Sequence, residues 1–200
     1  MSTKKYDVII VGGGAAGLSA AITLGSAQEK FEWAASKRIL LIDSGKSDLR
    51  AAKLNNAPGI SVGISGSNLL NSLFEQLAQF KSVEVIEGEV TTLEHKEQFI
   101  LTTSSATYQS EVVLLATGMQ KVNIESKLFA VEPHTAIARE GKVCYRNSDG
   151  EIVPNLYAVG LAKGLQTMYA IAAGDGADRA SKILWQWSGK PAVPHDVVGD

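Results

Sequence analysis

The fold is decided by residues 6–28, which read YDVIIVGGGAAGLSAAITLGSAQ. Residues 6–11 are an almost unbroken apolar run rich in β-branched side chains, which predicts a strand buried on both faces of a parallel sheet. Small and apolar side chains then recur at three- and four-residue spacing, so residues 15–28 are predicted to form a helix. A second apolar run at residues 38–43 predicts the next strand, which completes a βαβ unit.

Glycines spaced as G-x-G-x-x-G lie between this strand and this helix. Gly12 allows the tight turn, Gly14 lets a phosphate approach the backbone, and Gly17 lets the helix pack close to the strand. The N-terminus of the helix offers free N–H groups and the positive end of its dipole to that phosphate. The pattern predicts a dinucleotide site whose loop comprises Gly12, Gly13, Gly14, Ala15, Ala16 and Gly17.

Asp43 ends the second strand, where an acceptor for the ribose hydroxyls of a dinucleotide is expected. It lies 26 residues after Gly17, somewhat more than the usual ~20. An insertion around residues 29–36, between the helix and the strand, explains the excess. Ser44 and Gly45 follow Asp43 and are included in the predicted site.

The rest of the chain is patterned less strongly. A long irregular connection is expected over residues 44–66, and loops of this length are uncommon unless they are functional. An amphipathic helix is predicted over residues 69–80, capped by Ser65, Gly66 or Ser67. Antiparallel strands are predicted within 83–108, a buried strand at 111–116, and short strands at 142–146 and 155–159. Residues 119–141 are a weakly patterned crossing, and a long helix is predicted from about 168 to 187.

Composition excludes several classes of protein. With 200 residues, 45% of them hydrophobic and 20% charged, the chain is expected to fold as an ordinary globular domain. A formal net charge of −2 lacks the basic excess of a nucleic-acid-binding or anionic-membrane-binding protein. No segment approaches the ~18–20 apolar residues of a membrane span. Asp7 and the glycine run make the N-terminal stretch a poor signal peptide, so a cytoplasmic protein is expected.

Cysteine and histidine offer no obvious chemistry. Cys144 is the single cysteine, which excludes an intramolecular disulfide, a dithiol redox pair and a cysteine-rich zinc site, and we expect a buried or incidental thiol. His95, His134 and His195 have neither metal-like nor triad-like spacing and are expected to be solvated. No metal site and no catalytic side chain is therefore predicted.

Four segments together resemble the FAD-binding domain of the low-molecular-weight thioredoxin reductase family. They are the glycine loop in the form VGGGAAGLSAA, the segment Leu114–Gly118, the segment Asn56–Gly59 and the C-terminal run 155–180. The resemblance covers most of the chain. It implies an α/β Rossmann-like three-layer fold, with a parallel sheet and a small antiparallel β-meander, that binds FAD.

The same resemblance implies roles for individual residues. Ala116, Thr117 and Gly118 would close over the FAD, Asn56 would contact the flavin side, and Val90 would offer its backbone to adenine. The closing helix would begin beside the isoalloxazine, where Tyr169 is the best candidate to touch the ring. The turn Gly160, Leu161 and Ala162 matches a segment whose aspartate bonds the ribityl chain in the family, and Leu161 stands in its place.

Two glycines near the start of the last helix need an explanation, because each costs about 1 kcal/mol relative to alanine in a helix. Close packing against the glycine loop and the first helix would explain both Gly174 and Gly176. The alternative is that the helix begins only near Asp175. Trp185 and Trp187, near the other end, are better explained by helix packing or a homodimer contact than by stacking on flavin.

The residues between Gly118 and Gly160 are too few for the nicotinamide-binding domain that two-domain members of the family insert there, and no second glycine motif occurs. The chain is therefore predicted to be a single FAD-binding domain over residues 1–190 with a tail at 191–200. We expect a flavin-dependent oxidoreductase whose electron donor and acceptor, NAD(P)H or a partner protein, are open. The alternatives are a non-catalytic FAD-binding or redox-sensing module and an NAD-binding dehydrogenase without flavin.

Overall fold

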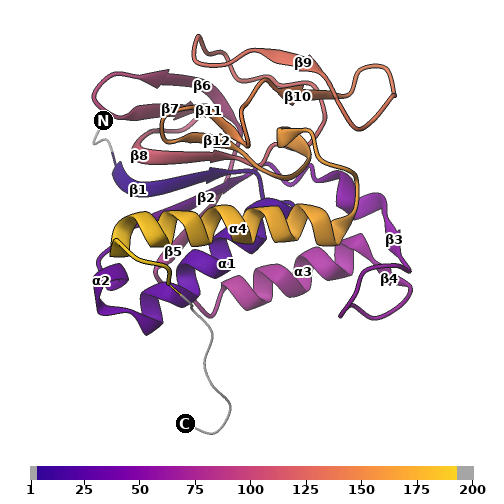
Figure 1. The fold of residues 1–200 in the computed structure, drawn as a ribbon, viewed down its shortest axis with the longest axis horizontal. Helices are drawn as coiled ribbons and strands as arrows, with labels where there is room; N and C mark the ends of the chain where they lie inside the picture. Colours follow the sequence, from indigo (N-terminus) through magenta and orange to yellow (C-terminus); the bar gives the residue numbers. More distant parts are fainter. Residues whose placement is uncertain (1–3, 193–200) are drawn as a thin grey trace, which may run out of the picture.

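A largely parallel sheet forms the middle layer of the computed structural model, which describes residues 4–192. Helices α1, α3 and α4 lie on one face of the sheet, and further β-strands lie on the other face (Figure 1). The three-layer α/β fold predicted from the sequence is confirmed. The predicted tail at 191–200 falls almost entirely outside the described residues.

The described strands and helices have the following bounds. The strands are β1 (Lys4–Val11), β2 (Ile39–Asp43), β3 (Lys53–Leu54), β4 (Ile64–Ser65), β5 (Val83–Glu87), β6 (Val90–His95), β7 (Phe99–Thr103), β8 (Thr107–Leu115), β9 (Val131–Pro133), β10 (Val143–Tyr145), β11 (Glu151–Val153) and β12 (Leu156–Ala158). The α-helices are α1 (Ala15–Lys30), α2 (Glu32–Ala35), α3 (Gly66–Leu77) and α4 (Tyr169–Ser188), with 3-10 turns η1 (Asp48–Ala51) and η2 (Gly160–Lys163).

The main sheet has the strand order β11-β12-β8-β1-β2-β5. Strands β12, β8, β1, β2 and β5 run parallel, so all five end at the same edge of the sheet. Strand β1 lies in the middle, and its residues Val8, Ile9 and Ile10 are completely buried. Burial on both faces explains why this strand reads as a continuous apolar run instead of an alternating one.

Strand β5 corrects the prediction of antiparallel strands throughout residues 83–108. It runs parallel to β2 at the edge of the main sheet, whereas β6, β7 and the start of β8 form the expected antiparallel meander. Only Val83 of this edge strand is buried, and its other residues are intermediate or exposed. Partly exposed strands that mix polar and apolar residues are also typical of antiparallel sheets, so the sequence pattern could not separate the two.

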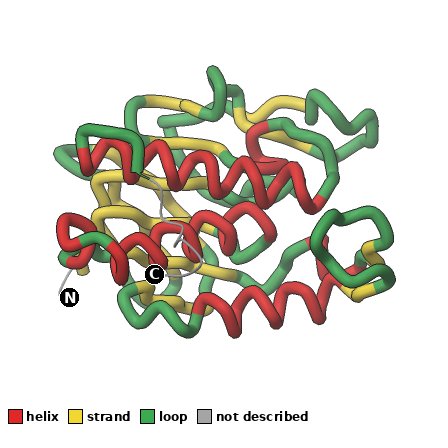
Figure 2. The backbone as a smooth tube through the Cα atoms, turned by 60° about the horizontal axis from the view of Figure 1, so that its bottom comes forward, coloured by secondary structure: helices red, strands yellow, loops and turns green. Residues whose placement is uncertain are grey.

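The helical face is held together by close contact between α1 and α4 (Figure 2). A Cβ atom on Gly176 would lie 2.0 Å from the carbonyl oxygen of Ala16, so the two helices need glycine at this position. Helix α4 begins at Tyr169, which excludes a start near Asp175. The packing explanation fails for Gly174, because a Cβ atom there would meet nothing within 4 Å.

Several connections hold more structure than the sequence pattern indicates. The stretch 44–66 contains the 3-10 turn η1 and the small β3–β4 ladder, and the predicted insertion at 29–36 contains the short helix α2. Ser65 caps α3, since its hydroxyl accepts a hydrogen bond from the Asn68 amide at 3.1 Å. The two short strands predicted at 142–146 and 155–159 do not pair with each other, because β10 pairs with β9 and β12 pairs with β11 and β8.

Within residues 4–192, no helix is both long enough and apolar enough to cross a bilayer. Trp187 packs against the core as predicted, and Trp185 is 52% exposed. Cys144 is buried, in agreement with the expectation for a structural thiol.

Candidate functional site

A cavity of about 340 Å³ opens at the carboxyl edge of the parallel sheet. All five parallel strands reach it at or just after their last residues, through Gly12, Asp43, Gly88, Ala116 and Val159. Open α/β sheets bind ligands at this edge, outside the carboxyl ends of the strands. The fold therefore places the cavity where a nucleotide cofactor would bind.

The glycine loop supplies the middle of the cavity. Gly12, with φ +108°, lies under the Ala116 carbonyl, and a Cβ atom there would approach that oxygen to 2.4 Å. A Cβ atom on Gly17 would lie 1.9 Å from the carbonyl oxygen of Gly12, so Gly17 lets α1 start directly against the loop. Gly14 differs from both, because its open side meets only the Ser47 side chain, at 3.3 Å. Gly12 and Gly17 thus shape the loop, and Gly14 leaves room in the cavity.

The N-terminus of helix α1 faces this space without a side-chain cap. Gly14 is the N-cap residue, and as a glycine it has no side chain that could accept a hydrogen bond from the first turn of the helix. The first N–H groups of an α-helix have no acceptor within the helix, and they carry its positive dipole end. This end of α1 therefore fits a phosphate or pyrophosphate group.

Asp43 lies at one end of the cavity, at the tip of β2. Its Oδ1 atom accepts a hydrogen bond from the Gly13 amide at 2.8 Å, which ties the tip of the strand to the glycine loop. Nothing in the sequence pattern indicates this bond. Each carboxylate oxygen can accept more than one hydrogen bond, so the side chain retains acceptor capacity for hydroxyl groups in the cavity.

Tyr169 lies at the start of α4 and lines the cavity together with Leu161, Met168 and Ala172. Burial raises the pKa of Tyr169, so its phenol stays protonated at neutral pH. Asn56 does not line the cavity but reaches its rim, where its Nδ2 atom lies 3.7 Å from the Met168 sulfur. This end of the cavity is mainly apolar.

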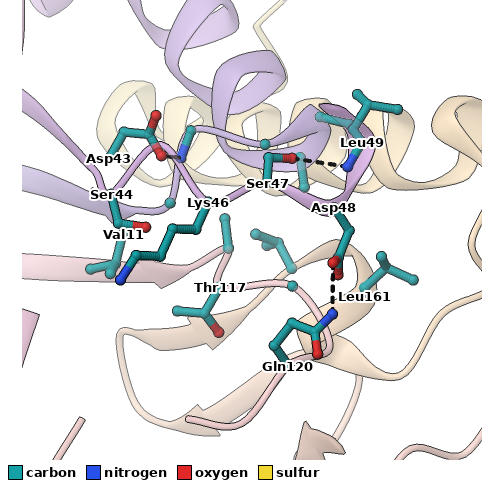
Figure 3. Close-up of a pocket in the computed structure, with 18 of the residues that line it drawn as sticks. Val11, Asp43, Ser44, Lys46, Ser47, Asp48, Leu49, Thr117, Gln120 and Leu161 are labelled. Carbon is teal, nitrogen blue, oxygen red and sulfur yellow. Dashed lines mark hydrogen bonds between the residues drawn. The ribbon is translucent and has the colours of Figure 1, made fainter. Parts of the chain in front are cut away.

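The loop after β2 forms a wall that the sequence analysis missed (Figure 3). Lys46 forms an ion pair with Glu89, and the Asp48 carboxylate accepts a hydrogen bond from Gln120 Nε2 at 2.6 Å. Both contacts join this loop to segments that follow β5 or β8. The unusual length of the 44–66 connection was the only signal for this wall, and it did not identify the residues.

Most residues of the predicted site line the cavity, and the others lie close to it. The lining residues are Gly12, Gly13, Gly14, Ala15, Ala16, Asp43, Ser44, Val90, Ala116, Thr117, Gly118, Leu161 and Tyr169. The predicted residues outside the lining are Gly17, Gly45, Asn56, Gly160 and Ala162. Gly160 packs against the glycine-loop helix, since a Cβ atom on it would lie 2.8 Å from Ala16 Cβ. The η2 turn that starts at Gly160 is thus fitted against the N-terminus of α1.

Asp175 fixes the same turn from helix α4. Its Oδ2 atom accepts a hydrogen bond from the Gly160 amide at 2.7 Å, and its Oδ1 atom accepts one from Lys163 Nζ at 3.0 Å. Lys163 also bonds Asp149, at 2.9 Å. Asp175 therefore holds the backbone of the turn from a position that does not line the cavity.

His134 corrects the prediction of a solvated surface residue. Its side chain is buried, with 6% of the residue exposed, and Nε2 lies 2.9 Å from the Leu161 carbonyl oxygen. Tyr145, also buried, places its hydroxyl 3.2 Å from the Thr117 hydroxyl, and burial raises the pKa of Tyr145 to about 12. Both side chains belong to the β9–β10 hairpin and contact segments that line the cavity.

Comparison with known sequences decides the family. The sequence profile of the pyridine nucleotide-disulphide oxidoreductases matches residues 6–142, which is more than half of the chain. The chain belongs to this family. It is also similar to the thioredoxin reductase of Treponema pallidum (strain Nichols), with 29% identity over 194 residues that cover 95% of this chain and 55% of that protein. A ferredoxin–NADP reductase from Streptococcus pneumoniae (strain CGSP14) is 31% identical over 123 residues, 58% of this chain and 36% of that protein.

Solved structures share the fold. A thioredoxin reductase from Gloeobacter violaceus superposes with a TM-score of 0.75 at 14% identity, covering 98% of this chain and 100% of that one. An oxidoreductase from Agrobacterium tumefaciens gives a TM-score of 0.71 at 17% identity, over 90% of this chain and 99% of that one. The chain is thus thioredoxin-reductase-like in sequence and fold, and it spans about half the length of the Treponema relative.

Proposed function

We propose that this chain binds FAD in the cavity at the carboxyl edge of its sheet and acts as a flavin-dependent oxidoreductase. The observation that carries the proposal is the N-terminus of α1, which has no side-chain cap and lines a cavity that Asp43 and Tyr169 also line. Membership of the pyridine nucleotide-disulphide oxidoreductase family supports a flavin as the occupant.

The residues present fit the parts of this cofactor. The space beside Gly14 and the N–H groups at the start of α1 suit the pyrophosphate. Asp43 suits the adenosine ribose, and the backbone of Val90, at the same edge of the sheet, suits adenine. The side chain of Leu161 offers no acceptor, so the ribityl chain would lose one contact that the resemblance implies.

When bound, FAD supplies the hydride or electron transfer, and the protein supplies binding, orientation and electrostatic tuning. Among the described residues that line the apolar end of the cavity, Tyr169 carries the titratable group, and its raised pKa keeps it a hydrogen-bond donor. The Thr117–Tyr145 pair and the Asp175–Gly160 bond hold the surrounding backbone in place. The chain's own contribution is thus to bind the cofactor and to hold it in position.

The proposed reaction is tested by supplying the FAD-loaded chain with NADH or NADPH and an artificial electron acceptor. Steady oxidation of the nicotinamide, lost when FAD is removed and restored when it is added back, is the expected result. A bound flavin that no donor reduces would instead favour a non-catalytic FAD-binding or redox-sensing module. A chain that binds NAD but not flavin would indicate a dehydrogenase.

Substitution of Asp43 separates its two contacts. Asp43→Ala removes both the Gly13 bond and the proposed ribose bond, and we expect the Kd for FAD to rise about tenfold. Asp43→Asn keeps an oxygen that can accept from the Gly13 amide, so its Kd should lie between those of the parent and the alanine variant. Quenching of FAD fluorescence on titration with apoprotein measures all three values. Equal affinities for the three proteins would show that Asp43 does not bind the cofactor.

A further inference from the structure

Thr117 and Leu161 form one wall of the cavity, and the β9–β10 hairpin is hydrogen-bonded to both of them. This hairpin is a two-stranded ladder separate from the main sheet, and it lies above the η2 turn in Figure 1. Its two buried polar side chains, His134 and Tyr145, each reach one of the two wall segments. Thr117 and Leu161 could line the cavity without these two hydrogen bonds, so the bonds need a separate explanation.

The hydrogen bonds of His134 define the tautomer of its ring. The Ala136 amide donates to Nδ1 at 3.2 Å, so Nδ1 is the acceptor nitrogen. A neutral imidazole that accepts at one nitrogen carries its proton on the other, so Nε2–H donates to the Leu161 carbonyl. The Gly164 amide donates to the same carbonyl oxygen at 3.0 Å. His134 therefore fixes the peptide that follows Leu161, in the turn that presents the Leu161 side chain to the cavity.

Tyr145 acts on the other wall segment in the same way. Its residue is 1% exposed, and its hydroxyl pairs with Thr117 Oγ1. A buried hydroxyl without a partner is costly, so this pair holds the Thr117 side chain and the start of the loop after β8 against the hairpin. Both hydrogen bonds start from the β9–β10 hairpin, and they reach Thr117 and Leu161 in the same wall of the cavity.

We propose that His134 and Tyr145 are positioning residues for the cofactor, which set the backbone at Leu161 and the side chain of Thr117 without touching the cofactor themselves. The inference rests on the proposed function, because the cavity is taken to hold FAD. It assigns a role to the β9–β10 hairpin, which holds the cavity wall formed by Thr117 and Leu161 in place.

The test separates the two bonds of His134 by two substitutions. His134→Gln can place an amide N–H near the position of Nε2 and keep the bond to Leu161, whereas His134→Asn can place an oxygen near Nδ1 and keep only the bond from Ala136. We expect the Kd for FAD to stay within about twofold of the parent for His134→Gln, and to rise about three- to tenfold for His134→Asn. Tyr145→Phe should raise it by a similar factor. His95 is exposed, so His95→Asn is the matched control, and its Kd for FAD should equal that of the parent.

Hydrogen exchange on the apoprotein supplies a second readout that needs no cofactor. The Gly164 amide donates to the Leu161 carbonyl, so its exchange should be faster in His134→Asn than in His134→Gln. Equal exchange and equal FAD affinity in the two variants would overturn the positioning role. If the parent chain binds no FAD, the proposed function fails, and the exchange comparison still decides whether His134 holds the turn. Thermal unfolding of each apoprotein identifies a variant that fails to fold. If a His134 variant does not fold, Tyr145→Phe tests the role of the hairpin through its contact with Thr117.

Discussion

Gly14→Val is expected to abolish FAD binding while leaving the fold intact. The backbone of Gly14 is at φ −85°, which every residue can adopt, and its open side meets only Ser47. A valine side chain at this position would occupy the space beside the helix N-terminus that is proposed for the pyrophosphate. We expect the Kd for FAD to rise at least about a hundredfold, equivalent to about 2.7 kcal/mol. Fluorescence titration of the apoprotein measures the affinity, and urea unfolding measures the stability.

Two further variants make this result specific. Gly14→Ala adds a single methyl group and should give an intermediate affinity. Gly174→Val makes the same change on the exposed side of α4, where a Cβ atom meets nothing within 4 Å, and should bind FAD like the parent. If Gly14→Val retained the affinity of the parent, the pyrophosphate would not lie beside the N-terminus of α1.

Gly176→Ala is expected to destabilise the protein strongly, because it adds a methyl group where α1 and α4 are in close contact. The new Cβ atom would lie 2.0 Å from the Ala16 carbonyl oxygen, so α1 and α4 would have to move apart. Overpacking of this kind costs about 3 kcal/mol. For a chain of this length that loss corresponds to a fall in Tm of roughly 6–12 °C.

Gly174→Ala is the matched control for this substitution, on the same helix and two positions away. It removes a helical glycine without creating a contact, so the free energy of unfolding should rise by about 0.5–1 kcal/mol. Differential scanning calorimetry of the two apoproteins gives the comparison. Equal shifts in Tm would show that α1 and α4 do not pack as closely as the structure indicates.

The parts of the fold that the sequence predicts well have a local physical cause. Strand β1 and the glycine loop are recognisable because burial on both faces and close backbone packing each demand particular residue types. The parallel direction of β5 was not predictable, because it depends on which strand lies beside it and not on its own pattern. The same reason explains why the β9–β10 pairing was missed.

In the candidate site, too, local motifs were predictable from the sequence and contacts between distant segments were not. Gly12, Gly13, Gly14, Asp43 and Tyr169 follow from motifs and from the resemblance, and in the structure they line the cavity. Lys46, Asp48 and Gln120 were missed, since their contacts join loops far apart in the sequence. His134 was predicted to be solvated because nothing near it in the chain reveals the Leu161 carbonyl, which lies 27 positions away. Only the tertiary structure brings these groups together.

One FAD per chain is proposed to bind in the cavity that begins at Gly14. Titration of purified apoprotein with FAD, followed by flavin fluorescence and by isothermal calorimetry, measures this binding. We expect saturable binding of one FAD per chain, which Gly14→Val removes and Gly174→Val leaves unchanged. A folded chain that carries no flavin after purification and binds none on titration would show that the cavity is not a flavin site.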